Sequence, residues 1–224
     1  MGSHHNPHLN RLSGAGLLIS LGIIFGDIGT SPLYVFKAIF NNNIINKDLV
    51  IGCVSCVLWT LTIQTTIKYV LITLNADNKG EGGILSLYSL VRRKAKWLII
   101  PAIVGASTLL ADGMITPAIT ISSAIEGLAI FSPDIPTVPI VIAIISCLFL
   151  IQRFGTSIVG RVFGPLMLVW FSVIGILGFN AIDHAPEILK AINPYYALQT
   201  IIHYPNALFI IGAIFLCTTG AEAL

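Results

Sequence analysis

An aspartate, Asp27, stands in the middle of an apolar segment that runs from about Leu17 to Phe40. A carboxylate at the centre of a membrane helix costs roughly 2.5–3.5 kcal/mol on insertion scales, so such residues face protein or water rather than lipid. The surrounding sequence, Gly26-Asp27-Ile28-Gly29-Thr30-Ser31-Pro32-Leu33-Tyr34, predicts an interrupted helix. An interruption frees backbone carbonyls, which at membrane depth must be buried in protein or line a cavity. Carbonyls, a carboxylate, hydroxyls and a tyrosine together indicate a site for a dehydrated cation.

The composition indicates an all-α polytopic membrane protein. Hydrophobic residues make up 55% of the chain and charged residues 10%, against about 25% charged residues in soluble domains. Because a membrane span needs about 20 mostly apolar residues, we expect a cytoplasmic tail over residues 1–13 and a transmembrane domain over 14–224. The domain would hold five spans and the start of a sixth, at about 14–40, 49–74, 98–131, 138–151 (short for a full crossing), 162–182 and from 207 onward.

Two longer polar connections separate these spans. Residues 75–97 contain Gly80-Glu81-Gly82-Gly83, a basic cluster, and an apolar stretch at 84–90 that we expect to form a short amphipathic helix on the membrane surface. Residues 183–206 contain three prolines and are predicted to hold one short helix around 186–192.

Lysine and arginine predict the orientation, because cytoplasmic loops carry an excess of both. With the N-terminus inside, the outer side would hold Lys47 and Lys190, and Lys37 would extend outward from the first span. The inner side would then hold most of the basic residues, namely Arg11, Lys79, Arg92, Arg93, Lys94, Lys96, Arg153 and Arg161. We therefore expect a multi-pass protein of the cell membrane with a cytoplasmic N-terminus, surrounded by membrane lipid.

Other functional classes find little support. The basic cluster at 92–96 lies next to long apolar segments, which favours a cytoplasmic loop over a nucleic-acid-binding surface. Cys53 and Cys56 form a C-x-x-C within an apolar helix, without a second pair at zinc spacing, so buried thiols are expected there. An enzyme is not expected, because no nucleophile–base or metal constellation is recognisable. No cofactor is expected either.

The third span carries a polar stripe formed by Asp112, Thr116, Thr120, Ser123 and Glu126. At about 100° per residue these side chains fall within roughly one third of the helix circumference, and such a stripe faces the bundle interior or water. Thr116 and Thr120 could ligate one ion, or could equally bond back to helix carbonyls near Pro117. Asp112 and Glu126 would lie about 21 Å apart, so we expect Glu126 in an outer vestibule.

The sixth span ends in Thr218-Thr219-Gly220-Ala221-Glu222, which repeats the chemistry of the first: hydroxyls, a glycine and a carboxylate within an apolar helix. Two interrupted helices in corresponding positions point to a transporter site built from inverted repeats. The G-x-x-x-G spacings at Gly22 and Gly26, and at Gly160 and Gly164, are explained by close helix packing.

The first-span sequence from Gly26 to Tyr34 resembles the signature of the Kup-type potassium uptake transporters. Three further stretches match the motifs of that family in the same order, namely Asn78-Lys79-Gly80-Glu81-Gly82-Gly83, Ala111-Asp112-Gly113-Met114-Ile115-Thr116-Pro117-Ala118 and Thr218-Thr219-Gly220-Ala221-Glu222-Ala223-Leu224. The resemblance runs from about Leu12 to the end of the chain.

The resemblance implies potassium uptake, coupled to protons, on a LeuT-type scaffold of two inverted five-helix repeats. It implies that Asp27 and Tyr34 bind potassium together with hydroxyls at Thr116, Thr120 and Thr219. It also implies proton coupling at Glu222, with Asp27 as a second carboxylate. Glu126 matches an acidic position of the third-span motif. Potassium is then the substrate and the proton the coupling ion.

The resemblance also implies much longer proteins, with a second repeat and a cytoplasmic C-terminal domain that we expect to be absent here. Three alternatives therefore stay open: a fragment that inserts without transporting, a cation channel, and a pathway completed by a homodimer. A channel usually carries a filter loop between spans, and none is visible in the sequence.

Overall fold

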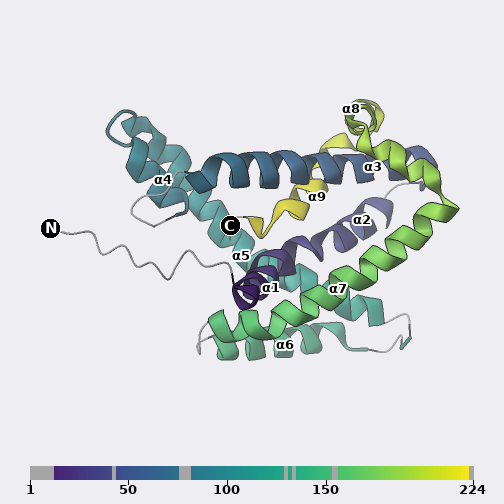
Figure 1. The fold of residues 1–224 in the computed structure, drawn as a ribbon, viewed down its shortest axis with the longest axis horizontal. Helices are drawn as coiled ribbons and strands as arrows, with labels where there is room; N and C mark the ends of the chain where they lie inside the picture. The colour runs from purple at the N-terminus through teal and green to yellow at the C-terminus, as the bar shows by residue number, and fades with distance from the viewer. Residues whose placement is uncertain are drawn as a thin grey trace.

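The structure, a computed structural model, describes residues 13–41, 44–75, 82–128, 131–132, 135–152 and 156–221. These residues form helices joined by short connections (Figure 1). The α-helices are α1 (Gly14–Ile28), α2 (Ser31–Asn41), α3 (Lys47–Thr60), α4 (Ile84–Val91), α5 (Ile99–Leu128), α6 (Thr137–Gln152), α7 (Thr156–His184), α8 (Pro194–His203) and α9 (Ala207–Phe215). A π-helix, η1 (Leu61–Ile72), continues α3, and shorter 3-10 turns are η2 (Thr73–Asn75), η3 (Lys96–Leu98), η4 (Pro186–Ile192) and η5 (Leu216–Thr218).

Within the described residues, four helical segments are long and apolar enough to cross a membrane. They are Gly16–Asn41, Lys47–Ile72, Lys96–Leu128 and Val162–His184. Two shorter apolar helices, Thr137–Ile151 and Ala207–Thr218, correspond to the predicted short fourth span and the start of the sixth. The prediction of an all-helical chain is confirmed for the described residues, and the apolar helices are consistent with a polytopic membrane protein. The LeuT-type repeat stays a prediction. The N-terminal tail lies outside the described residues except for Ser13.

Helix α9 lies between α2 and α3, and the three helices share the main apolar core (Figure 1). The fully buried members of this core are Val35, Ile39, Leu49, Cys53, Ile210 and Cys217. On the other side, α1 packs along α7, and Gly164 of α7 lies directly against the Leu18 carbonyl. A β-carbon at Gly164 would overlap that carbonyl, so the glycine permits the close approach that its G-x-x-x-G spacing predicts.

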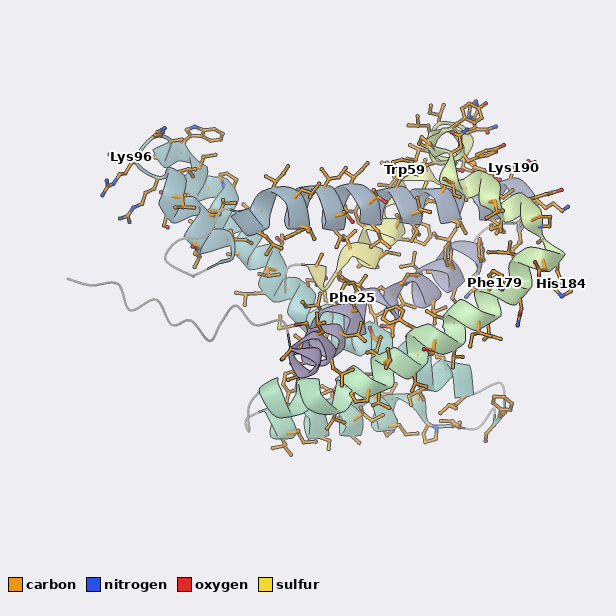
Figure 2. The ribbon with its side chains drawn as sticks, in the orientation of Figure 1. Phe25, Trp59, Lys96, Phe179, His184 and Lys190 are labelled. Carbon is orange, nitrogen blue, oxygen red and sulfur yellow. The ribbon has the colours of Figure 1, made fainter. Side chains whose placement is uncertain are left out.

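Basic side chains mark the two ends of the molecule. Lys96 lies at one end, whereas His184 and Lys190 lie at the opposite end (Figure 2). Lys47 belongs to the second end as well, because its ammonium lies 3.5 Å from the Glu187 carboxylate. Which of these ends faces the cytoplasm stays a prediction. Three residues of that prediction, Arg11, Lys79 and Arg153, lie outside the described residues.

The connection between α7 and α9 is more helical than the sequence suggested. The short helix predicted around 186–192 is present as η4, but a second helix, α8, follows directly. The Asn193 side chain accepts a hydrogen bond from the Tyr195 amide, and Pro194 occupies the first turn of α8. An asparagine cap followed by proline is a helix-start signal. Helix α8 was not predicted from the sequence, because the connection as a whole is polar and rich in proline. The amphipathic helix expected at 84–90 is present as α4.

Candidate functional site

The first span is interrupted where the sequence predicted. Helix α1 ends at Ile28, a turn covers Gly29 and Thr30, and α2 begins at Ser31. The carbonyls around the break are nevertheless occupied, contrary to expectation. The Thr30 hydroxyl donates to the Gly26 and Asp27 carbonyls, both at 3.1 Å, and the Ser31 hydroxyl donates to the Asp27 carbonyl at 2.9 Å. Hydroxyl side chains bond back to helix carbonyls three or four residues earlier, so these carbonyls are not open ligands.

A carbonyl at the centre of the turn is bound from another span. The Trp170 indole of α7 donates a hydrogen bond of 3.1 Å to the Gly29 carbonyl. The Phe171 ring next to it reaches the space where a β-carbon at Gly29 would stand. The break is therefore held by α7 rather than left open to a cavity.

The sixth span breaks in the same region. After η5, Thr219 has extended backbone (ψ 143°) and Gly220 has a φ of +89°. L-residues with a side chain rarely adopt that φ. Gly220 also faces the first break, because a β-carbon there would lie 2.9 Å from the Asp27 β-carbon. The two interruptions therefore touch each other at Asp27 and Gly220.

A hydrogen-bond network joins the polar side chains of both breaks. The Tyr34 hydroxyl donates to the Ser31 Oγ at 2.9 Å. The same Ser31 oxygen lies 3.4 Å from the Asp27 Oδ1 and 3.4 Å from the Thr219 Oγ1. Ser31 is fully buried and Tyr34 is 8% exposed. The structure thus brings together Asp27, Tyr34 and Thr219, whose role as ion ligands stays a prediction.

Ser31, at the centre of this network, was not singled out from the sequence. Its spacing could have revealed it, since Ser31 follows Asp27 by four residues and precedes Tyr34 by three. Side chains at these separations lie on one face of a helix. The glycines and Pro32 in this stretch indicate a helix break. That signal is stronger than the helical spacing that places Asp27, Ser31 and Tyr34 on one face.

The hydroxyls of the third span form a separate group on α5. The Thr116 hydroxyl donates to the Asp112 Oδ1 at 3.0 Å, one turn away. The Thr120 hydroxyl oxygen is buried and has no hydrogen-bond partner among the described residues. Ile119, next to it in sequence, packs against the core that contains Tyr34. The described hydrogen bonds do not link Thr116 or Thr120 to the network around Ser31.

A cleft of about 490 Å³ lies beside the network, between α2, α5 and α9. Tyr34 lines it on α2, Ser123 and Glu126 line it on α5, and Ala213 lines it on α9. The Glu126 carboxylate pairs with the Lys37 ammonium at 2.8 Å. Glu126 therefore shares a cleft with Tyr34, which is compatible with the vestibule expected from the sequence.

The arrangement places the Asp27 carboxylate next to the Ser31 hydroxyl, and the hydroxyls of Tyr34 and Thr219 lie next to the same serine. No group of three or more His, Cys, Asp or Glu side chains suited to a metal ion occurs in the described part of the chain. Glu222, the predicted proton-coupling residue, lies outside the described residues.

Comparison with known proteins gives one family throughout. Residues 15–224 match the model described as the K+ potassium transporter integral membrane domain. A probable potassium transport system protein Kup of Flavobacterium johnsoniae is 62% identical over 99% of this chain and 34% of its own length. Proteins of the same name from Cytophaga hutchinsonii and Clostridium perfringens are 58% and 52% identical, over 96% and 99% of this chain and 33% and 36% of their own lengths. No solved structure matches.

Proposed function

Because this chain belongs to the K+ potassium transporter family, we propose that it forms the ion-binding part of a transporter that takes potassium up across the cell membrane. The chain spans about one third of the length of the curated relatives that it matches. Transport by the whole protein is therefore part of the proposal. The observation that carries it is the network at Ser31, which joins a carboxylate and hydroxyls from two interrupted helices.

The chemistry of the network supports potassium as the substrate. Potassium is large and weakly hydrated, and a pathway must bind it strongly enough for dehydration but weakly enough for release. Asp27 supplies the charge, and Ser31, Tyr34 and Thr219 supply neutral oxygens. The Tyr34 hydroxyl points at Ser31, so its oxygen rather than its ring face contributes.

Hydroxyls of α5 would complete the ligand shell. Thr120 has a buried hydroxyl without a hydrogen-bond partner among the described residues, so its lone pairs could face an ion. Thr116 already donates its proton to Asp112, which leaves its oxygen lone pairs available. Both residues lie on α5. Ile119 and Ser123 of the same helix line the cleft that also contains Tyr34.

Proton coupling would use two carboxylates, Asp27 and Glu222. In this proposal one carboxylate holds potassium while the other takes up or releases a proton, so that each ion changes the affinity for the other. The scaffold would be a LeuT-type fold in which this chain supplies the first five-helix repeat. Alternating access would come from rocking of one bundle against the other, with the N-terminus in the cytoplasm.

The alternative is that this chain inserts into the membrane and binds the ion without transporting it, or that it works as a channel or a homodimer. The two readings separate in a chimera that joins this chain to the remaining part of the Flavobacterium johnsoniae relative, here called the completed chimera. Rubidium uptake by the chimera alone would identify the chain as a binding part that needs the rest.

Ion binding can be tested on the chain itself. We would measure its thermal unfolding midpoint in detergent while potassium chloride replaces N-methylglucamine chloride at constant ionic strength. A ligand that binds the folded state raises the midpoint by mass action. We expect the rise in the wild type and in Asp183→Asn, an exposed carboxylate on α7, and its loss in Asp27→Asn. An equal rise in Asp27→Asn would contradict the proposed site.

A further inference from the structure

Lys37 of α2 and Glu126 of α5 form an ion pair, although the two residues are 89 positions apart in sequence. Its nitrogen and oxygen lie 2.8 Å apart, and the two side chains are 45% and 53% exposed. An ion pair that is half exposed adds little to stability. Because the pair contributes little to the free energy of unfolding, its role is inferred from its position in the structure.

The pair lies on the cleft that adjoins the proposed potassium site. Lys37 and Glu126 both line this cleft together with Tyr34. Lys37 follows Tyr34 by one turn of α2, a rise of about 4.5 Å. Tyr34 in turn contacts Ser31, which lies beside Asp27 and Thr219. One face of α2 therefore leads from the ion pair through Tyr34 and Ser31 to the Asp27 carboxylate at the end of α1.

The pair also lies toward the end of the molecule that holds Lys190. Helix α5 follows directly after Lys96 and contains 30 residues, a length of about 45 Å, and Glu126 lies two residues before its end. Lys96 and Lys190 mark opposite ends of the molecule (Figure 2). Helix α2 leads into the connection where Lys47 pairs with Glu187. By the predicted orientation this is the outer side.

Among the described residues that line the cleft, only Lys37 and Glu126 are charged. Ser122, Ser123 and Asn41 add polar groups, whereas the other lining residues apart from Tyr34 are apolar. With the predicted orientation, a cation that enters this cleft from outside would meet Glu126 before Tyr34. Glu126 is the one carboxylate among the described residues that line the cleft. That carboxylate is already occupied by a monovalent cation, the Lys37 ammonium.

On this geometry we propose that Glu126 is an outer binding site for the incoming cation and that Lys37 is a tethered competitor that keeps the site closed until potassium displaces its ammonium. This inference rests on the proposed function, since it assumes that the cleft leads to a potassium site. The exchange replaces one monovalent cation at the Glu126 carboxylate by another, while the displaced Lys37 ammonium turns to solvent, to which its side chain is already 45% exposed. Because the pair is half exposed, the two side chains separate at little cost.

The test uses rubidium uptake by the completed chimera as a function of external rubidium. Lys37→Met removes the competitor, so the KM should fall, by about two- to fivefold for a half-exposed contact. Glu126→Gln removes the site, so the KM should rise by a similar factor. The double variant should behave like Glu126→Gln. Lys37→Arg keeps the charge and should keep the wild-type KM.

A second ion pair provides the matched control. Lys47 and Glu187 have the same chemistry at 3.5 Å with a more exposed lysine, and neither lines the cleft. Glu187→Gln should leave the KM unchanged. The thermal unfolding midpoint of each variant separates a folding defect from an uptake effect. A variant that unfolds is replaced by another change that removes the same charge, Lys37→Gln or Glu126→Ala, with the same expected direction.

The proposal predicts KM shifts of opposite sign in Lys37→Met and Glu126→Gln. Equal directions in Lys37→Met and Glu126→Gln, or an unchanged KM in both, would overturn it, because a purely structural pair predicts that the two variants act alike. The proposed function fails separately, through an Asp27→Asn variant that retains uptake. Loss of uptake in Asp27→Asn with no KM shift at Lys37 would overturn the tethered competitor alone.

Discussion

Gly220 packs against Asp27 so closely that a β-carbon on Gly220 would lie 2.9 Å from the Asp27 β-carbon and 3.3 Å from its Oδ2. The two residues come from the first and last spans, and each lies at a break in its helix. Gly220 thus holds the carboxylate against the sixth span and brings Thr219 next to Ser31. The geometry of the candidate ion site depends on this contact.

Replacing Gly220 should therefore be costly. Gly220→Ala puts a side chain at a φ of +89°, which costs roughly 1–2 kcal/mol by itself, and it adds overlap with Asp27. We expect a lower thermal unfolding midpoint and the loss of stabilisation by potassium. Gly212→Ala in α9 is the control, because nothing lies within 4 Å of its β-carbon position. An unchanged midpoint in Gly220→Ala would contradict the contact.

The contact between α1 and α7 gives a second prediction. Gly164→Ala places a methyl group onto the Leu18 carbonyl, and overpacking of this kind costs about 1–3 kcal/mol. Gly175→Ala lies on the same helix with open space around its β-carbon position. The thermal midpoint should fall in the first variant and stay within error in the second. Equal midpoints would mean that the two helices do not pack as described.

Removal of the central hydroxyl should disturb both stability and binding. Ser31→Ala leaves the buried Tyr34 hydroxyl without its acceptor, at a cost of about 1–3 kcal/mol. We expect a lower midpoint and a weaker response to potassium, because Tyr34 loses its orientation. Ser172→Ala removes an exposed hydroxyl that bonds back to Leu168 and should change neither quantity. A full potassium response in Ser31→Ala would exclude Ser31 from the site.

The unpartnered hydroxyl of Thr120 gives a prediction with two opposite signs. A buried hydroxyl without a partner costs about 1–3 kcal/mol on mutational scales, so Thr120→Val should raise the midpoint in the absence of potassium. If Thr120 is an ion ligand, the same variant should lose part of the rise that potassium causes. Thr108→Val, on an exposed face of α5, should do neither. A higher midpoint with an intact potassium response would leave Thr120 without a ligand role.

The sequence was sufficient to predict the helical membrane architecture and the position of the first break. Apolar length and the glycines and proline around Asp27 are local signals. The structure confirms the break, and four of the predicted spans are helices long and apolar enough to cross a membrane. The motif at Thr219 and Gly220 likewise pointed to a second break. The expectation of open carbonyls failed because Thr30, Ser31 and Trp170 bind them. Trp170 lies 141 residues from Gly29, so no local pattern could indicate that contact.

Other features depend on packing between distant segments. The ion pair of Lys37 with Glu126 joins residues that the sequence placed separately, one extending outward and one in a vestibule. The π-helix η1 continues α3 without proline or glycine at the transition, and no sequence signal marks it. The position of Thr120 relative to the network at Ser31 depends on how α5 packs against α2, which helix periodicity does not determine.

The most direct test of the proposed transport role is rubidium uptake by the completed chimera in cells that lack their own potassium uptake systems. Uptake by the wild-type chimera, and its loss in Asp27→Asn with Asp183→Asn unaffected, is the result that the proposed site predicts. Undiminished uptake in Asp27→Asn would contradict it, because the cation would then cross without the carboxylate on which the site is built.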